Sequence, residues 1–134
     1  MTPLTIQDIL RACREAFDKN ELQAQDPNNK SHVCLYASPC AIGAALPFKL
    51  AKSIDNTGEV SFRGLVNSRN DIFDFDSSGE EADDLANLQY CHDEWQSAKA
   101  DGKDVSQFHL FFNKTLKNLE AKYNANCGSQ PTAF

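Results

Sequence analysis

Apolar side chains recur at intervals of three and four residues in three segments of this chain, which is the pattern of amphipathic helices. The last segment has the widest apolar face, made of Val105, Phe108, Phe112, Leu116, Leu119 and Tyr123. The segment after residue 80 carries Leu85, Leu88, His92 and Trp95. The first segment carries Ile6, Ile9, Leu10, Cys13 and Phe17. The pattern predicts helices over residues 5–19, over residues 80–99, and from Asp104 or Ser106 onward.

The start of the first predicted helix carries a capping signal. Thr5 and Asp8 have the three-residue spacing of a capping box, in which each side chain bonds the backbone N–H of the other residue.

Between these segments the pattern is weaker. Ser38 and Pro39 suit the N-cap and first position of a helix that Pro47 would end, and Phe48 to Ile54 indicate one or two further turns. Residues 32–36 and 60–62 are short strand candidates. The expected fold is therefore mainly α, with four to five helices in a single compact domain. An α+β fold with one short hairpin is the alternative.

The chain of 134 residues has the length of one domain and shows no internal repeat. We expect residues 1–126 to form one helical domain and residues 127–134 to be a flexible tail. The N-terminus lacks the pattern of a signal peptide, and no apolar run approaches the roughly 20 residues that span a bilayer. These features predict a cytoplasmic protein without a membrane partner.

The cysteines and histidines do not form a recognisable metal or nucleotide motif. Five cysteines are irregularly spaced and contain no C-x-x-C pair, which favours reduced thiols over disulfides or zinc. The three histidines lack the spacing of a zinc-binding helix. Glycine-rich phosphate loops and the G-x-S-x-G elbow are also absent from the sequence. We therefore predict no cofactor.

Two short motifs, C-A-I-G-A at residues 40–44 with Pro47 and L-Q-x-x-H-D at residues 88–93, resemble a pair that recurs in a group of small uncharacterised bacterial and phage proteins. The resemblance covers residues 32–120. It departs from the group after Pro47, where Phe48 and Lys49 replace an acidic pair. The resemblance implies a shared fold and no particular activity.

Cys40 is the first candidate for chemistry, because a helix N-terminus would stabilise its thiolate. His92 would then be the base, and Asp93 or Gln89 the orienting or oxyanion group, of a cysteine-dependent hydrolase or transferase. However, neighbours on a helix point about 100° apart, so we expect Asp93 not to orient His92. The favoured alternative is packing, with Cys40 as a small apolar residue and His92 as a hydrogen-bonded core residue that joins the two motifs.

Residues 71–84 contain acidic side chains and no Lys or Arg. We call these acids the acidic stripe: Asp71, Asp74, Asp76, Glu80, Glu81, Asp83 and Asp84. The net charge of −6 and the scattered basic residues argue against direct nucleic-acid binding. The stripe would instead attract a protein with a basic surface, including one that handles nucleic acid. The plainer alternative is a solvated loop before a helix N-terminus.

Part of the stripe also half-matches a calcium loop. Asp74, Asp76, Ser78 and Gly79 occupy positions one, three, five and six of an EF-hand, but Leu85 stands at position twelve, where a Glu should close the site. This segment is a weak calcium candidate, and we expect a turn followed by an acidic helix start.

Three functions follow from these observations. The favoured one is a small acidic accessory protein that binds a protein, for example a phage-type inhibitor of a host defence or nucleic-acid-handling protein. The second is the cysteine-dependent hydrolase or transferase that uses Cys40 and His92. The third is an oligomer that sequesters a small signalling molecule between its helices. The lack of a convincing catalytic arrangement favours a non-enzymatic function.

Overall fold

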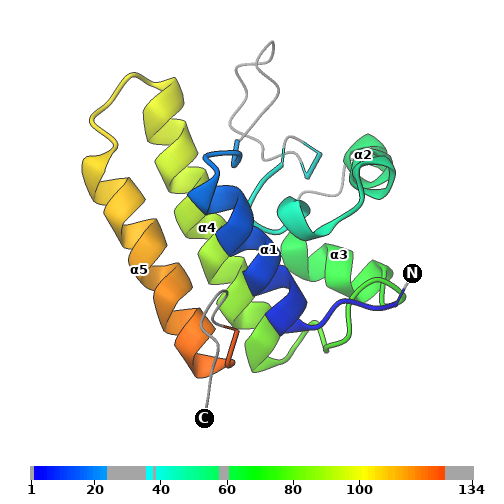
Figure 1. Ribbon diagram of the computed structural model, residues 1–134. Helices are drawn as coiled ribbons and strands as arrows, with labels where there is room; N and C mark the ends of the chain where they lie inside the picture. The colour runs from blue at the N-terminus through cyan, green and yellow to red at the C-terminus, as the bar shows by residue number, and fades with distance from the viewer. Residues whose placement is uncertain (1, 24–35, 38, 58–60, 126–134) are drawn as a thin grey trace.

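The described part of the chain is built from α-helices, as the computed structural model in Figure 1 shows. The structure describes residues 2–23, 36–37, 39–57 and 61–125. Its elements are α1 (Ile6–Asp18), the short 3-10 helix η1 (Gly43–Ala45), α2 (Phe48–Thr57), α3 (Phe62–Ser68), α4 (Glu80–Ala100) and α5 (Ser106–Lys122). Strands are absent from these residues, apart from an isolated parallel bridge between Leu4 and Phe73. The predicted mainly α, single-domain fold is confirmed.

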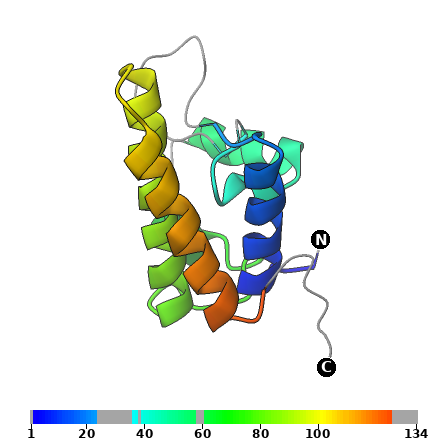
Figure 2. The ribbon, with the colours of Figure 1, turned by 60° about the vertical axis from the view of Figure 1, so that its left-hand side comes forward.

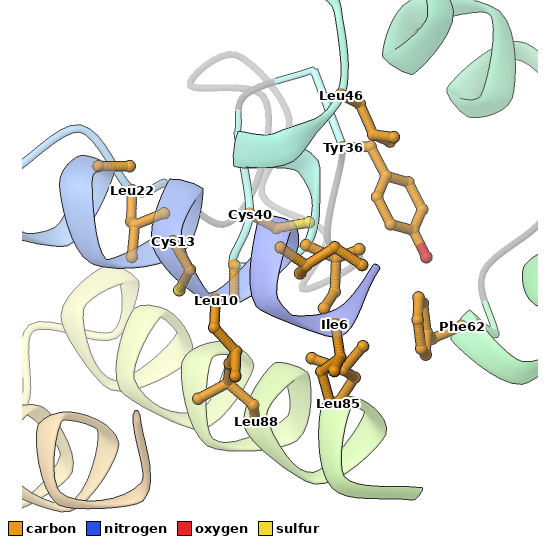
Figure 3. Packing of buried hydrophobic residues seen from close by; sticks show 14 of the residues in the cluster. Ile6, Leu10, Cys13, Leu22, Tyr36, Cys40, Leu46, Phe62, Leu85 and Leu88 are labelled. Carbon is orange, nitrogen blue, oxygen red and sulfur yellow. The ribbon is translucent and has the colours of Figure 1, made fainter. Parts of the chain in front are cut away.

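The helices surround one core. α4 and α5 run antiparallel on one side of the molecule, and α1 and α2 lie on the other side (Figures 1 and 2). Ile6 and Leu10 of α1 point toward Leu85 and Leu88 of α4, as Figure 3 shows. All four side chains are buried, so this contact forms the centre of the core.

Aromatic rings extend the core toward the loop between α4 and α5. The rings of Phe17, Trp95 and Phe112 have centroids 5.3 to 5.7 Å apart, which joins α1, α4 and α5 at one place. Gly102, in the turn between α4 and α5, has a φ of 72°, a left-handed conformation that glycine adopts without strain.

The predicted start of the first helix is confirmed. Thr5 Oγ1 accepts a hydrogen bond from the Asp8 N–H at 3.2 Å, and Asp8 Oδ2 accepts one from the Thr5 N–H at 3.0 Å. At the last helix the N-cap is Val105 rather than Asp104 or Ser106. Asp104 still accepts the backbone N–H of Ser106 at 3.0 Å, so its carboxylate satisfies one of the free donors there.

The helix predicted to begin at Pro39 does not form, and this prediction is wrong. Between Pro39 and Pro47 only the three residues of η1 are helical, and they follow a turn. The backbone of Tyr36 lies against Gly43, where a Cβ atom would stand 2.0 Å from the Tyr36 carbonyl oxygen. Where the Tyr36 backbone approaches Gly43, the chain forms the tight turn of η1 and no regular α-helix. Ser38, its predicted N-cap, lies outside the described residues.

The weakly periodic region 55–79 contains a helix that the sequence pattern did not predict. Ser61 is the N-cap of α3 and accepts the Gly64 N–H at 3.2 Å, so the predicted strand at 60–62 is wrong. The helix has seven residues and buries Phe62, Leu65 and Val66, which is too short a run to show a helical period. Residues 32–35 of the strand candidate 32–36 lie outside the described residues, and Tyr36 stands in a turn. The predicted tail 127–134 also lies outside the described residues.

None of the helices found in the described ranges has the length and apolar character that a bilayer crossing requires.

Candidate functional site

Cys40 lies in the core of the molecule. Its exposed fraction is 0%, and its sulfur accepts a hydrogen bond from the Gly43 N–H at 3.3 Å. It precedes a turn and not an α-helix, so the helix N-terminus expected to stabilise a thiolate is missing. Cys13 of α1 is buried nearby, as Figure 3 shows. Burial raises the pKa of the Cys13 thiol far above its usual value, and the neighbouring Cys40 adds to the increase.

Gln89 joins the two sequence motifs. Its Oε1 accepts the backbone N–H of Ile42 at 3.2 Å, and its Nε2 donates to Asp93 Oδ1 at 2.8 Å. Ile42 and Gln89 are both buried, so this bond satisfies a donor and an acceptor that water cannot reach. The predicted connection between the motifs exists, but Gln89 makes it and His92 does not.

His92 and Asp93 are in contact, contrary to the expectation from helical geometry. His92 Nδ1 lies 3.1 Å from Asp93 Oδ1. The Asp93 carboxylate lies between the side chains of Gln89 and His92 and contacts both, although these two residues project from α4 in different directions. The prediction that Asp93 could not orient His92 is therefore wrong. If Nδ1 carries the proton, it donates to the carboxylate and Nε2 is the acceptor.

The other ring nitrogen of His92 is enclosed. Nε2 is buried and has no hydrogen-bond partner among the residues that the structure describes, although both nitrogens were expected to be bonded. The ring packs edge-to-face against Trp95 and Phe112, with centroid distances of 6.1 and 6.0 Å. An orienting carboxylate and a free acceptor are parts of a catalytic base, but this base faces aromatic rings.

The cluster fits packing better than catalysis. A cysteine hydrolase needs a thiol and an imidazole within hydrogen-bond reach and open to substrate. Cys40 and His92 both have an exposed fraction of 0%, and no hydrogen bond joins them in the described structure. Of the four candidate catalytic residues, Asp93 is the one with a solvent-accessible side chain, 35% exposed.

A small apolar pocket lies beside this cluster, between η1 and α2. Its volume is about 230 Å³. Its lining comprises Tyr36, Ala37, Pro39, Gly43, Ala44, Leu46, Phe48 and Ala51. Cys40, Gln89 and His92 are not among the lining residues, so the pocket does not open onto the candidate catalytic groups. Its volume is below the range of about 300 to 1,000 Å³ that is usual for small-molecule sites.

Two acids of the acidic stripe pair with arginines. Asp71 receives two hydrogen bonds from Arg69, at 3.0 and 3.1 Å, which lower the pKa of its carboxyl group. Asp83 in the first turn of α4 forms an ion pair with Arg63 of α3. The second pair links two helices that the sequence pattern could not place side by side.

Two further acids of the stripe pair with the end of α5. Lys122 bonds both Glu80 and Asp84, the latter at 2.8 Å. The hydroxyl of Tyr123 also donates to Asp84. Desolvation and this hydrogen bond raise the pKa of Tyr123 to about 12.

The remaining acids of the stripe are Asp74, Asp76 and Glu81. The Asp76 carboxylate accepts the hydroxyl of Ser78 at 2.9 Å, and the Asp76 carbonyl accepts the Gly79 N–H, which forms the predicted turn before α4. Among the described residues, no three His, Cys, Asp or Glu side chains gather as metal ligands. Asp74, Asp76 and Glu81 have no ion-pair partner within the same residues and are the uncompensated charges of the stripe.

Exposed apolar side chains on α4 and α5 were not singled out from the sequence. Tyr90 is 62% exposed, Leu110 63% and Phe111 59%. The sequence could have predicted this exposure from the consecutive residues Leu110, Phe111 and Phe112, because three adjacent apolar residues cannot all face the core from one helix.

Comparison of the chain with protein-family models, with curated proteins and with solved structures found no match. The resemblance based on the two short motifs therefore stays a prediction.

Proposed function

We propose that the chain is a small accessory protein that acts by binding another protein, and that its acidic stripe faces a basic surface of that partner. The observation that carries this proposal is the charge that the stripe keeps after its internal pairing. Seven acids face three cations, Arg63, Arg69 and Lys122, which leaves a net charge of −4.

The internal ion pairs also support binding by holding the stripe in one arrangement. Arg63 connects α3 to α4 through Asp83, and Lys122 connects α5 to the first turn of α4. A surface whose charges are already fixed loses less conformational entropy on binding than a flexible acidic segment. Asp74 and Glu81 lie within this framework and are free to meet cations of a partner.

The partner that we propose is a nucleic-acid-handling or host-defence protein in the cytoplasm. Proteins that hold nucleic acid carry clustered Lys and Arg, and an acidic protein surface can occupy the same cluster. The motif pair resembles one in phage and bacterial proteins. We therefore propose more specifically that the chain is a phage-type inhibitor of such a protein.

The other two functions have less support. Catalysis by Cys40 and His92 requires both side chains to reach a substrate, and both are buried. Sequestration of a small signalling molecule requires a pocket of sufficient size, and the pocket beside η1, at about 230 Å³, is smaller than usual small-molecule sites.

Charge reversal tests the proposal. The variant Asp74→Lys with Glu81→Lys changes two of the three uncompensated acids and leaves the internal ion pairs in place. The control Glu15→Lys with Glu21→Lys makes the same change of net charge on and just after α1, where Glu15 and Glu21 are exposed. Affinity capture from a host lysate is done with the wild type and both variants.

We expect a protein that the wild type and the control retain and the stripe variant loses, and whose binding weakens as salt concentration rises. Retention by the stripe variant, or equal loss from both variants, would reject the acidic stripe as the binding surface.

A further inference from the structure

The outer surface of the α4–α5 pair exposes apolar side chains next to unpaired charges. Tyr90, Leu110 and Phe111 are each more than half exposed. The pair stands on one side of the molecule, so the surface turned away from α1 is not covered by another described helix (Figure 2). Glu94 is exposed four residues after Tyr90, and Lys114 is exposed three to four residues after Leu110 and Phe111, so each set lies on one side of its helix. We call these five residues the hairpin face.

The two helices of the hairpin face carry opposite charge. α4 contains one lysine, Lys99, and six acids: Glu80, Glu81, Asp83, Asp84, Asp93 and Glu94. α5 contains three lysines and one acid, Glu120, which is buried against Arg14. Glu94 on α4 and Lys114 and Lys117 on α5 form no ion pair within the described ranges.

We propose that the hairpin face binds the same face of a second copy of this chain. A twofold dimer requires a surface that is complementary to itself. If α4 of one copy lies across α5 of the other, the acidic helix meets the basic helix twice. The alternative twofold arrangement places α4 on α4 and brings like charges together, so the charges select the first arrangement.

The register of α4 and α5 places a specific pair of charges in contact across this interface. Cys91 Sγ lies 3.9 Å from Thr115 Oγ1, and Asp84 bonds Tyr123, so the helices are antiparallel with residue 94 at the level of residue 112. A twofold axis parallel to the helices preserves this level. Glu94 of one copy then lies within about one helical turn of Lys114 of the other.

The apolar side chains fill the space between these charges. Phe111 on α5 lies at about the level of Glu94, and Tyr90 lies one turn from Glu94 on α4. Exposed aromatic residues of this kind are enriched in the centres of protein interfaces. The dimer interface is separate from the surface proposed to bind a basic protein. Glu94 and Lys114 lie in the middle of α4 and α5, away from the acidic stripe at the first turn of α4. Each dimer would carry two acidic stripes.

Mass measurement by sedimentation velocity over a concentration series tests the dimer. We expect the wild type to reach twice the chain mass and Phe111→Glu to remain at the mass of one chain. The control Phe48→Glu changes a residue of α2 that is 66% exposed, and it should leave the dimer intact. A wild type that stays monomeric throughout, or a dimer that persists in Phe111→Glu, would overturn the proposal.

A charge swap tests the arrangement of the helices. Glu94→Lys and Lys114→Glu should each raise the dimer dissociation constant about tenfold, because the twofold axis repeats the changed pair. The double variant should return the constant to the wild-type value. A double variant as weak as the single ones, with helical circular dichroism unchanged, would reject the placement of α4 across α5.

Discussion

Gly43 shows how one residue determines the backbone around Cys40. The chain at Tyr36 passes so close to η1 that a Cβ atom at residue 43 would meet the Tyr36 carbonyl oxygen at 2.0 Å and its carbonyl carbon at 2.7 Å. Both atoms belong to the backbone and cannot turn aside as a flexible side chain could. Any residue other than glycine would displace one of the two segments.

We predict that Gly43→Ala lowers the free energy of unfolding by about 1 to 3 kcal/mol, the usual cost of overpacking in a core. Urea denaturation followed by circular dichroism measures the change. The control is Gly79→Ser, where a Cβ atom would lie 3.4 Å from the nearest atom and serine is a good N-cap for α4. A Gly43→Ala variant as stable as the control would contradict the close approach.

At the scale of elements, a buried ion pair joins α1 to α5. Arg14 Nε and Nη2 donate to the two carboxylate oxygens of Glu120 at 3.0 and 2.9 Å. The Glu120 side chain is 7% exposed, and the bond to Glu120 raises the pKa of Arg14. Removing the arginine would leave a carboxylate in the core without its partner.

We predict that Arg14→Met lowers the free energy of unfolding by about 3 kcal/mol, because an unpaired buried charge is costly. The double variant Arg14→Met with Glu120→Leu should lose less than the single variant, since no charge then remains. Lys19→Met, which removes the exposed 3.7 Å pair with Glu15, is the control and should change stability by less than about 0.5 kcal/mol. Equal losses in the single and double variants would contradict this account.

Helices with a long periodic face could be predicted, and short ones could not. Local sequence predicts α1 from the capping box at Thr5 and α4 from the apolar face between Leu85 and Trp95. A long helix repeats its buried face several times, so its period can be recognised. α3 shows that face only once or twice in its seven residues. The conformation of η1 depends on its contact with the backbone of Tyr36. A contact between two separate segments leaves no periodic pattern in the local sequence.

The candidate site was predictable in composition but not in its contacts. The sequence identified Gln89, His92 and Asp93 as residues of interest. Their hydrogen bonds depend on side-chain rotamers, and helical geometry alone suggested the wrong pairing for His92. The cations that pair with the acidic stripe could not be predicted either, because Arg63 and Lys122 reach the stripe only through the packing of α3 and α5 on α4.

At the scale of the whole molecule, Cys40, Gln89 and His92 of the two sequence motifs lie in the core, and the proposed binding surfaces lie outside it. Gln89 fastens the C-A-I-G-A segment to α4, while the acidic stripe and the hairpin face occupy different parts of the surface. This separation predicts that changes on either surface affect binding without unfolding the protein, whereas changes at Gly43 or Gln89 affect stability first. Thermal denaturation of the surface variants described above measures the difference.

Cys40 packs in the core, and we expect its thiol not to react in the folded protein. Native-state alkylation of all five cysteines, followed peptide by peptide in increasing denaturant, tests it most directly. We predict that Cys40 and Cys13 are modified only at the rate at which the whole protein unfolds, and that this rate rises with denaturant as global unfolding does. Rapid modification of Cys40 in the folded protein would contradict this packing role and would favour the cysteine-dependent hydrolase over protein binding.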